Sequence, residues 1–201
     1  MRAELEQRFR QVFTELADVP DEEWQFFWSH VQEQRFKSGA HLFRDGKPAR
    51  AIHYLLSGLV RIYHNVDGAE LVRGFDYEGR FVAVFESILT GDPSGVNVQA
   101  LEPTHTLWFP GAMLKHLYER HLCWERVGRK LLEQQWLRRQ DKEARFRIYS
   151  PEAHYRLLLE RRSPLVSRVP LRQLASYLQI APETLSRIRA RLRKGVSAVD
   201  E

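Results

Sequence analysis

The stretch from about Gln34 to Phe109 most constrains what this chain can fold into. Short runs rich in β-branched and aromatic residues alternate there with breaks at glycine. Leu59–His64 and Glu70–Phe75 flank Asp67-Gly68, a dipeptide that supplies the positive φ angles of a tight turn, so we expect a β-hairpin. Many short strands with frequent turns indicate an antiparallel barrel or sandwich rather than a parallel sheet with alternating helices.

Helical periodicity is present on both sides of this stretch. Before it, four apolar residues recur at i, i+3, i+4 and i+7 and predict a helix with one buried face: Trp24, Phe27, Trp28 and Val31. After it, a short helix is expected around Met113–Leu117 and a long one from about Trp124 to Ile148. A further helix should begin at Ser150, which suits an N-cap, and end near Glu160, with Ser163-Pro164 as a break.

The long helix has apolar residues on two faces. Trp124, Val127, Gly128 and Leu131 lie on one face, and Leu132 and Trp136 lie on another. A helix that is apolar on two faces must be packed on two sides. The second partner could be the same chain or another copy of it.

Charge is distributed unevenly along the chain. Residues 1–125 carry a net charge of −5, residues 126–195 carry +12, and the whole chain carries +5. A mildly acidic front half and a strongly basic back half suggest a regulatory or catalytic module joined to one that binds a polyanion. A solvated basic helix surface is the other interpretation of the same charge.

The segment from Val169 to Gly195 has the pattern of a helix-turn-helix. A short helix over Val169–Leu178 precedes a tight connection, and Pro182 starts a second helix. On that second helix Leu185, Ile188 and Leu192 form an apolar stripe. The opposite side carries Glu183, Arg187, Ala190 and Lys194. Arginine can donate two hydrogen bonds to guanine and glutamate can accept one from cytosine, so this face suits the major groove. A helical hairpin with a charged surface is the alternative.

Other classes of protein are disfavoured. A single cysteine, Cys123, excludes an internal disulfide and a cysteine-rich metal site. We find no phosphate-binding glycine loop, no nucleophile elbow and no His-Glu-x-x-His motif, so we expect no catalytic residue, metal or cofactor. His53 and His105 are interpreted as structural strand residues. No apolar run approaches the length of a membrane span, which predicts a cytoplasmic protein with no membrane partner.

Together these segments resemble the CRP/FNR superfamily of bacterial transcription regulators, over about residues 25–195. The front of the chain resembles it through Phe43–Pro48, Tyr54–Arg61, Asp67-Gly68 and Gly79–Phe81. The back resembles it through Leu174–Leu178 and Pro182–Ile188.

The resemblance implies an α+β fold in three parts. Residues 1–121 would be a cyclic-nucleotide-binding-like antiparallel β-roll of the double-stranded β-helix or jelly-roll type, with flanking helices. Residues 122–149 would be a dimerisation helix, and residues 150–201 a helix-turn-helix DNA-binding domain. Because the chain ends shortly after Lys194, the wing that follows the recognition helix in many relatives should be short or missing.

The resemblance also implies partners and site residues. The partners are double-stranded DNA, a second copy of the chain and RNA polymerase. By similarity to the fumarate-nitrate branch, Glu183, Ser186 and Arg187 would read bases in an inverted repeat with half-sites similar to TTGAT. We expect Arg172, Arg189 and Arg191, at the flanks of the helices, to contact phosphates.

Several departures limit what the resemblance implies. The cyclic-AMP binders hold ribose and phosphate with Gly-Glu and Arg-Ser/Thr pairs, whereas this chain has Ala83-Val84 and Ser94-Gly95. We therefore expect that the effector is not cyclic AMP or is absent, and we leave its identity open. If a ligand binds, the available polar groups are those of Glu86, Ser87, Thr90 and Ser94. In the helix-turn-helix, Gln179 replaces the usual turn glycine and Ala181 the usual Ser/Thr cap.

Two functions of different classes fit these observations. The first is a dimeric DNA-binding regulator. The second is a cyclic-nucleotide-type sensor module that acts on a protein partner, which leaves the exposed face with Glu183 and Arg187 without a role.

Overall fold

The computed structural model describes residues 2–197, without the side chains of residues 162–163 and 193–197. The helices are α1 (Arg2–Thr14), α2 (Asp21–Trp28), α3 (Phe85–Thr90), α4 (Met113–Arg120), α5 (Leu122–Ile148), α6 (Pro151–Arg168), α7 (Leu171–Tyr177) and α8 (Pro182–Ser197). The strands are β1 (Gln32–Phe36), β2 (His41–Phe43), β3 (Ala51–Ser57), β4 (Leu59–Val66), β5 (Ala69–Tyr77), β6 (Phe81–Val82), β7 (Asn97–Ala100) and β8 (Thr104–Pro110).

Two antiparallel four-stranded sheets form the centre of the molecule. One has the strand order β1-β8-β3-β6 and the other the order β2-β7-β4-β5. The predicted hairpin is confirmed: β4 pairs with β5, and Asp67 and Gly68 turn the chain with φ angles of 51° and 82°. Apolar side chains fill part of the space between the sheets, as expected for facing pleated surfaces: Phe43, Ala49, Leu55, Val60, Val82, Val96 and Val98.

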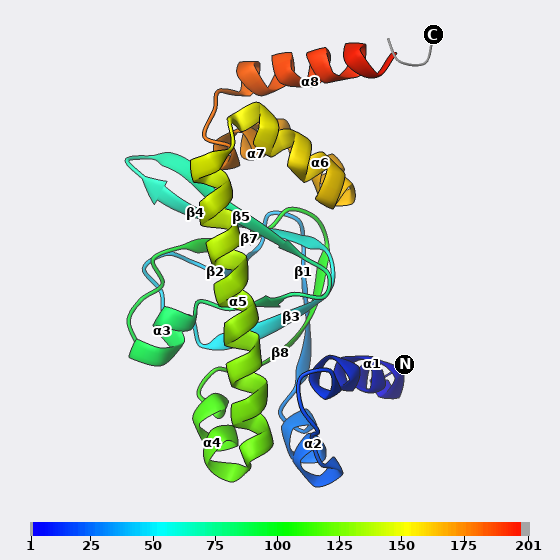
Figure 1. Cartoon of the computed structure of the whole chain (residues 1–201). Coiled ribbons are helices and arrows are strands. Elements are labelled where there is room, and N and C mark those ends of the chain that lie inside the picture. Colours follow the sequence, from blue (N-terminus) through cyan, green and yellow to red (C-terminus); the bar gives the residue numbers. More distant parts are fainter. Residues whose placement is uncertain (1, 198–201) are drawn as a thin grey trace.

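Helices α1, α2 and α4 gather around the first half of α5 at one end of the molecule (Figure 1). Their aromatic side chains pack against the sheet that contains β3 and β8, and Phe9, Trp24, Phe27 and Trp124 are almost fully buried. Buried Glu23 links α2 to α4 and α5, because it accepts hydrogen bonds from Arg120 Nε and from Trp124 Nε1 at 2.9 Å each. The predicted stripe around Trp24 is therefore core, while helix α1 was not expected from the sequence.

Helix α6 corrects one sequence expectation. We expected a break at Ser163-Pro164, yet α6 continues through Pro164 to Arg168. Proline in a helix interior removes one backbone hydrogen bond and disfavours the helix. Here Leu165 and Val166, directly after the proline, are buried in the core that α6 shares with α7 and α8, and this burial offsets the cost.

Helix α5 changes its surroundings along its length. Its first turns bury Cys123, Trp124, Val127 and Gly128 against the molecule. Farther along, the second apolar face lies open: the exposed fractions of Leu132 and Trp136 are 50% and 61%. Figure 1 shows α5 running beside the sheets from the α4 end to the α6 end.

His53 on β3 is a buried titratable group. Its exposed fraction is 3%, its Nδ1 lies 3.1 Å from Thr106 Oγ1, and the rings of Phe36 and Phe43 lie beside it. Burial lowers the pKa of His53 to about 4 because the charged imidazolium would lose its hydration. A buried strand histidine of this kind agrees with the structural role that we assigned to it from the sequence.

Because His53 is buried and neutral, we expect the free energy of unfolding to fall in mild acid. Between pH 6.5 and about 4 the unfolded chain binds a proton at His53 and the folded chain does not, so stability falls as the pH falls through that window. In urea unfolding at about pH 7 and about pH 5, His53→Gln should abolish about 2 kcal/mol of the pH-dependent loss. Exposed His116→Gln is the control and should keep the wild-type pH dependence. An unchanged pH dependence in His53→Gln would contradict the assignment.

Candidate nucleic-acid interface

The helix-turn-helix is formed by α7, the connection 178–181 and α8. Leu174, Ala175 and Leu185 are fully buried where the two helices meet, so the small side chain of Ala175 lies at their crossing. Gln179 has a φ angle of +59°, the left-handed conformation that glycine adopts most easily. The turn therefore has the geometry of a glycine turn although its residue is glutamine.

Helix α8 has one buried and one exposed side. Leu185 and Ile188 are buried, while Glu183, Ser186 and Arg187 are exposed. The Arg187 guanidinium lies 3.5 Å from Thr184 Oγ1. The structure therefore brings the three residues expected to read bases onto one open face. Lys194, also expected on that face, lies outside the described side chains.

The three arginines expected at phosphates have different surroundings. Arg172 is exposed and makes no hydrogen bond or ion pair with the described residues. Arg189 donates from Nε to the Tyr155 hydroxyl at 3.0 Å, and Arg191 donates to Glu152 at 2.5 Å. Both are thus engaged by side chains of α6. Helix α8 extends to Ser197, the last described residue, so the expectation of a short or missing wing falls outside the described residues.

Helix α7 covers the open edge of a sheet. Strand β5 is the last strand of its sheet, so part of its backbone lacks a strand partner. Ser176 Oγ accepts from the amide of Val72 at 3.0 Å and donates to the carbonyl of Glu70 at 3.1 Å. Around this contact one apolar core includes side chains of both β4–β5 and α6–α8, for example Tyr63, Val72, Phe75, Leu158, Leu174 and Tyr177.

The contact between α6–α8 and the β4–β5 hairpin is called the joint below. Arg168, at the end of α6, adds a charged contact to this joint. Its guanidinium donates to Glu78 at 2.8 and 3.1 Å and also to both carboxylate oxygens of Glu102. These hydrogen bonds hold the pKa of Glu78 below its usual range and raise the pKa of Arg168. The ion pair joins the helix-turn-helix unit to the end of β5 and to the β7–β8 loop.

Lys142 on α5 lies at the third side of this joint. Its ammonium donates to the carbonyl of Arg73 and lies near the rings of Phe146 and Tyr177. Burial lowers the pKa of Lys142 to about 8. Lys142, Arg168 and Ser176 were not expected at a site from the sequence, because each acts through a contact with a residue far away along the chain.

The polar residues expected at an effector site hydrogen-bond locally. Ser87 Oγ accepts from the Ala49 amide and donates to the Asp92 carbonyl, and Ser94 Oγ donates to the Val96 carbonyl. Thr90 donates to the carbonyl of Glu86, whose side chain is exposed. These contacts shape the 86–96 segment, and the effector role of the four residues stays a prediction.

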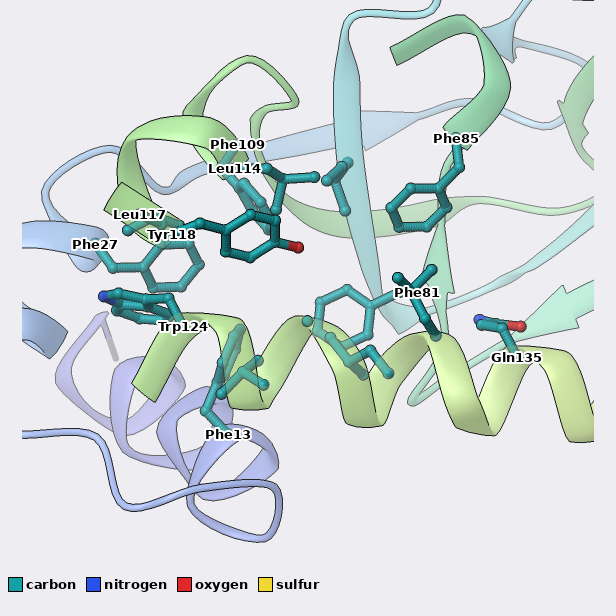
Figure 2. Close-up of a pocket in the computed structure, with 15 residues that line it drawn as sticks. Phe13, Phe27, Phe81, Phe85, Phe109, Leu114, Leu117, Tyr118, Trp124 and Gln135 are labelled. Atoms are coloured by element: carbon teal, nitrogen blue, oxygen red, sulfur yellow. The ribbon is translucent and has the colours of Figure 1, made fainter. Parts of the chain in front are cut away.

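An apolar cavity of about 50 Å³ lies between α5, α4 and the sheet that contains β3 and β8 (Figure 2). Aromatic side chains such as Phe27, Phe81 and Phe85 line it, and the Tyr118 hydroxyl and Gln135 are its polar groups. Gly128 makes room for Tyr118, since a Cβ there would lie 2.3 Å from the phenol oxygen. Ligand pockets start at about 300 Å³, so the cavity is too small for a nucleotide.

Among the described residues, no group of three or more His, Cys, Asp or Glu side chains could hold a metal ion. No described helix is both long and apolar enough to cross a membrane.

The ion pairs of Arg168 with Glu78 and Glu102 should stabilise the docking of α6–α8 on β5. Arg168→Gln should weaken the docking of α6–α8 on β5 by about 2 kcal/mol, between the values for exposed and buried ion pairs. Hydrogen exchange should then be faster at the Val72 amide, which Ser176 protects in the docked state. Lys115→Gln, which removes an exposed ion pair with Glu119 on α4, is the control. Unchanged protection of Val72 in Arg168→Gln would show that Arg168 does not hold the joint.

This chain is similar to a known domain family and to several solved structures. Residues 33–121 match the cyclic nucleotide-binding domain family, and the comparison with curated proteins found no match. Among solved structures, FixK2 from Bradyrhizobium japonicum is 19% identical, with a TM-score of 0.68 over 82% of this chain and 85% of FixK2. The c-di-GMP-responsive global regulator CLP from Xanthomonas campestris is 21% identical, with a TM-score of 0.67 over 88% of this chain and 93% of CLP.

DNR from Pseudomonas aeruginosa is 25% identical, with a TM-score of 0.52 over 87% of this chain and 81% of DNR. FixK2, CLP and DNR are CRP/FNR family transcription regulators. The α+β fold predicted from the sequence is confirmed by these similarities. Residues 33–121 are thus similar to the cyclic nucleotide-binding domain family, and the chain has the fold of the CRP/FNR family of transcription regulators.

Proposed function

We propose that this protein is a cytoplasmic, sequence-specific DNA-binding transcription regulator that acts as a homodimer on an inverted-repeat operator. It has no catalytic activity of its own, and RNA polymerase is its expected partner at the promoter. The proposal rests on the fold and on the exposed face of α8, described above.

The exposed face of α8 carries the proposal. Glu183, Ser186 and Arg187 project from the first turns of a helix whose other side is buried, and the first turns of a recognition helix contact base edges. Arg187 would donate to guanine O6 and N7, and Glu183 would accept from cytosine N4. Ser186 would contact a neighbouring base, and exposed Arg172 would contact a phosphate.

The open half of α5 supports the homodimer. Leu132 and Trp136 lie one helical turn apart and are more than half exposed on average, which is unusual for large apolar side chains on a monomer. A second copy packed in parallel on this face would cover both residues. Its two-fold axis would place the two α8 helices about 34 Å apart, one turn of DNA.

Cyclic AMP is not the effector in this proposal. Ala83 and Val84 supply no carboxylate for a ribose hydroxyl. Ser94 is buried, and its hydroxyl hydrogen-bonds to the Val96 backbone, so it offers neither a charge nor a free donor to a cyclic phosphate. A buried phosphate without an arginine partner would be strongly disfavoured.

A sensor module that acts on a protein partner is the second candidate. It would use the same β-sheets, but it gives no role to the exposed Glu183/Arg187 face. DNA binding distinguishes the two candidates, because a protein-directed sensor has no reason to prefer one duplex sequence over another.

The first prediction from this proposal concerns base readout. In fluorescence polarisation, the protein should bind a duplex with inverted TTGAT-like half-sites more tightly than a random duplex. Arg187→Ala should cost about 1–3 kcal/mol per half-site and relax the preference at its base pair. Arg172→Ala should weaken binding to both duplexes by the same factor. The proposal fails if Arg187→Ala lowers binding to both duplexes equally or leaves specific binding unchanged.

The second prediction concerns the dimer. Trp136→Glu places a charge on the open face of α5 and should convert a dimer into a folded monomer, measured by sedimentation at micromolar concentration and by circular dichroism. Leu89→Glu is the matched control, because Leu89 is 75% exposed on α3 rather than on α5, and its variant should stay dimeric. A wild-type protein that sediments as a monomer both with and without DNA would refute the dimer.

A further inference from the structure

Glu152 is an acidic side chain that contacts two arginines, Arg156 on its own helix and Arg191 on α8. It lies in the first turn of α6, where the helix dipole favours a carboxylate. One carboxylate oxygen accepts from Arg156 at 3.0 Å and the other from Arg191 at 2.5 Å. Both arginines are more than half exposed, so Glu152 neutralises part of a solvent-facing cationic surface.

The position of Arg191 connects Glu152 to the exposed face of α8. Arg187 and Arg191 are four residues apart on the same helix, and side chains at this spacing are neighbours. The carboxylate of Glu152 therefore holds the cation that lies one turn beyond the expected base-reading arginine. The described contacts include no hydrogen bond or ion pair between Glu152 and Glu183, Ser186 or Arg187, so the base-reading group itself is unaffected.

The contact of Arg189 with Tyr155 differs in charge from the contact of Arg191 with Glu152. The Tyr155 hydroxyl accepts from Arg189 at 3.0 Å, but a neutral phenol leaves the charge of the guanidinium in place. Arg191 instead faces an anion of the same kind as a phosphate oxygen. DNA can reach Arg191 only in competition with Glu152.

We propose that Glu152 is an internal competitor of the DNA phosphate, which lowers the affinity for every duplex and leaves the base preference unchanged. The inference rests on the proposed DNA-binding function and adds a residue that sets overall affinity. Since each phosphate neutralised by a cation releases counterions, occupying Arg191 removes about one such contact from the salt dependence of binding. Residues 126–195 would then bind duplex DNA of any sequence less tightly than they would if Arg191 were unpaired.

A purely structural role predicts the opposite sign. If the Glu152–Arg191 pair served only to fasten α8 to α6, removing the charge would loosen α8 and weaken DNA binding. If Glu152 competes with phosphate, removing the charge strengthens binding. Glu152→Gln keeps the size of the side chain, and Glu160→Gln on the same helix is the matched control, because Glu160 is exposed and has no hydrogen bond or ion pair within the described part of the chain.

The experiment measures polarisation of a labelled random duplex and of the TTGAT-like duplex from about 50 to about 200 mM salt. Glu152→Gln should tighten binding to both duplexes by about three- to tenfold, and should make the slope of log affinity against log salt more negative by about 0.9. Glu160→Gln should match the wild type. In an Arg191→Ala background most of the gain from Glu152→Gln should disappear, and thermal melts should confirm that every variant is folded.

The outcomes separate the inference from the proposed function. If the wild type binds DNA and Glu152→Gln binds with equal or lower affinity while folded, the competitor role is overturned. The same holds if the full gain persists without Arg191, because Glu152 then acts on DNA by direct repulsion. If neither wild type nor Glu152→Gln binds any duplex at the lowest salt concentration, the DNA-binding function itself is overturned.

Discussion

The contact of α7 with the open edge of β5 determines how the two halves of the chain are arranged. An edge strand must hide its unpaired backbone groups from other strands. Here the hydroxyl of Ser176 pairs with the backbone of β5 on both sides of Leu71, and the apolar side chains around it make one core from both halves. Arg168 adds an ion pair at one side of the joint. The exposed face of α8 is therefore held in a defined orientation relative to the sheets.

Through this joint, a displacement of the sheet that contains β5 can be transmitted to α8. Strand β5 pairs with β4, and β4 pairs with β7, so a shift within that sheet moves the surface on which α7 rests. Helix α5 contacts the same place through Lys142 and the β5 carbonyl of Arg73. Any ligand that alters the sheet or the position of α5 therefore acts on the helix-turn-helix through packed contacts rather than through a flexible linker.

The predictions from the sequence succeeded where local chemistry decides the structure. Asp67-Gly68 readily adopts the positive φ angles of a tight turn, and the apolar spacing of Leu185 and Ile188 is that of a helix with one buried side. The continuation of α6 through Pro164 was missed because the local penalty is visible in the sequence and the burial of Leu165 that offsets it is not. The contacts of Ser176 and Arg168 and the pair of Glu152 with Arg191 could not be assigned, since the partners lie on other elements and only the folded chain brings them together.

Gln179 shows how the angle between α7 and α8 is maintained. A side chain in the left-handed region costs about 1–2 kcal/mol, so the connection does not by itself prefer this shape. The crossing of the helices at Ala175 and Leu185, both fully buried, must impose it. The geometry of a helix-turn-helix can thus survive the loss of its customary glycine, and a search pattern that requires glycine at this position would overlook proteins built in the same way.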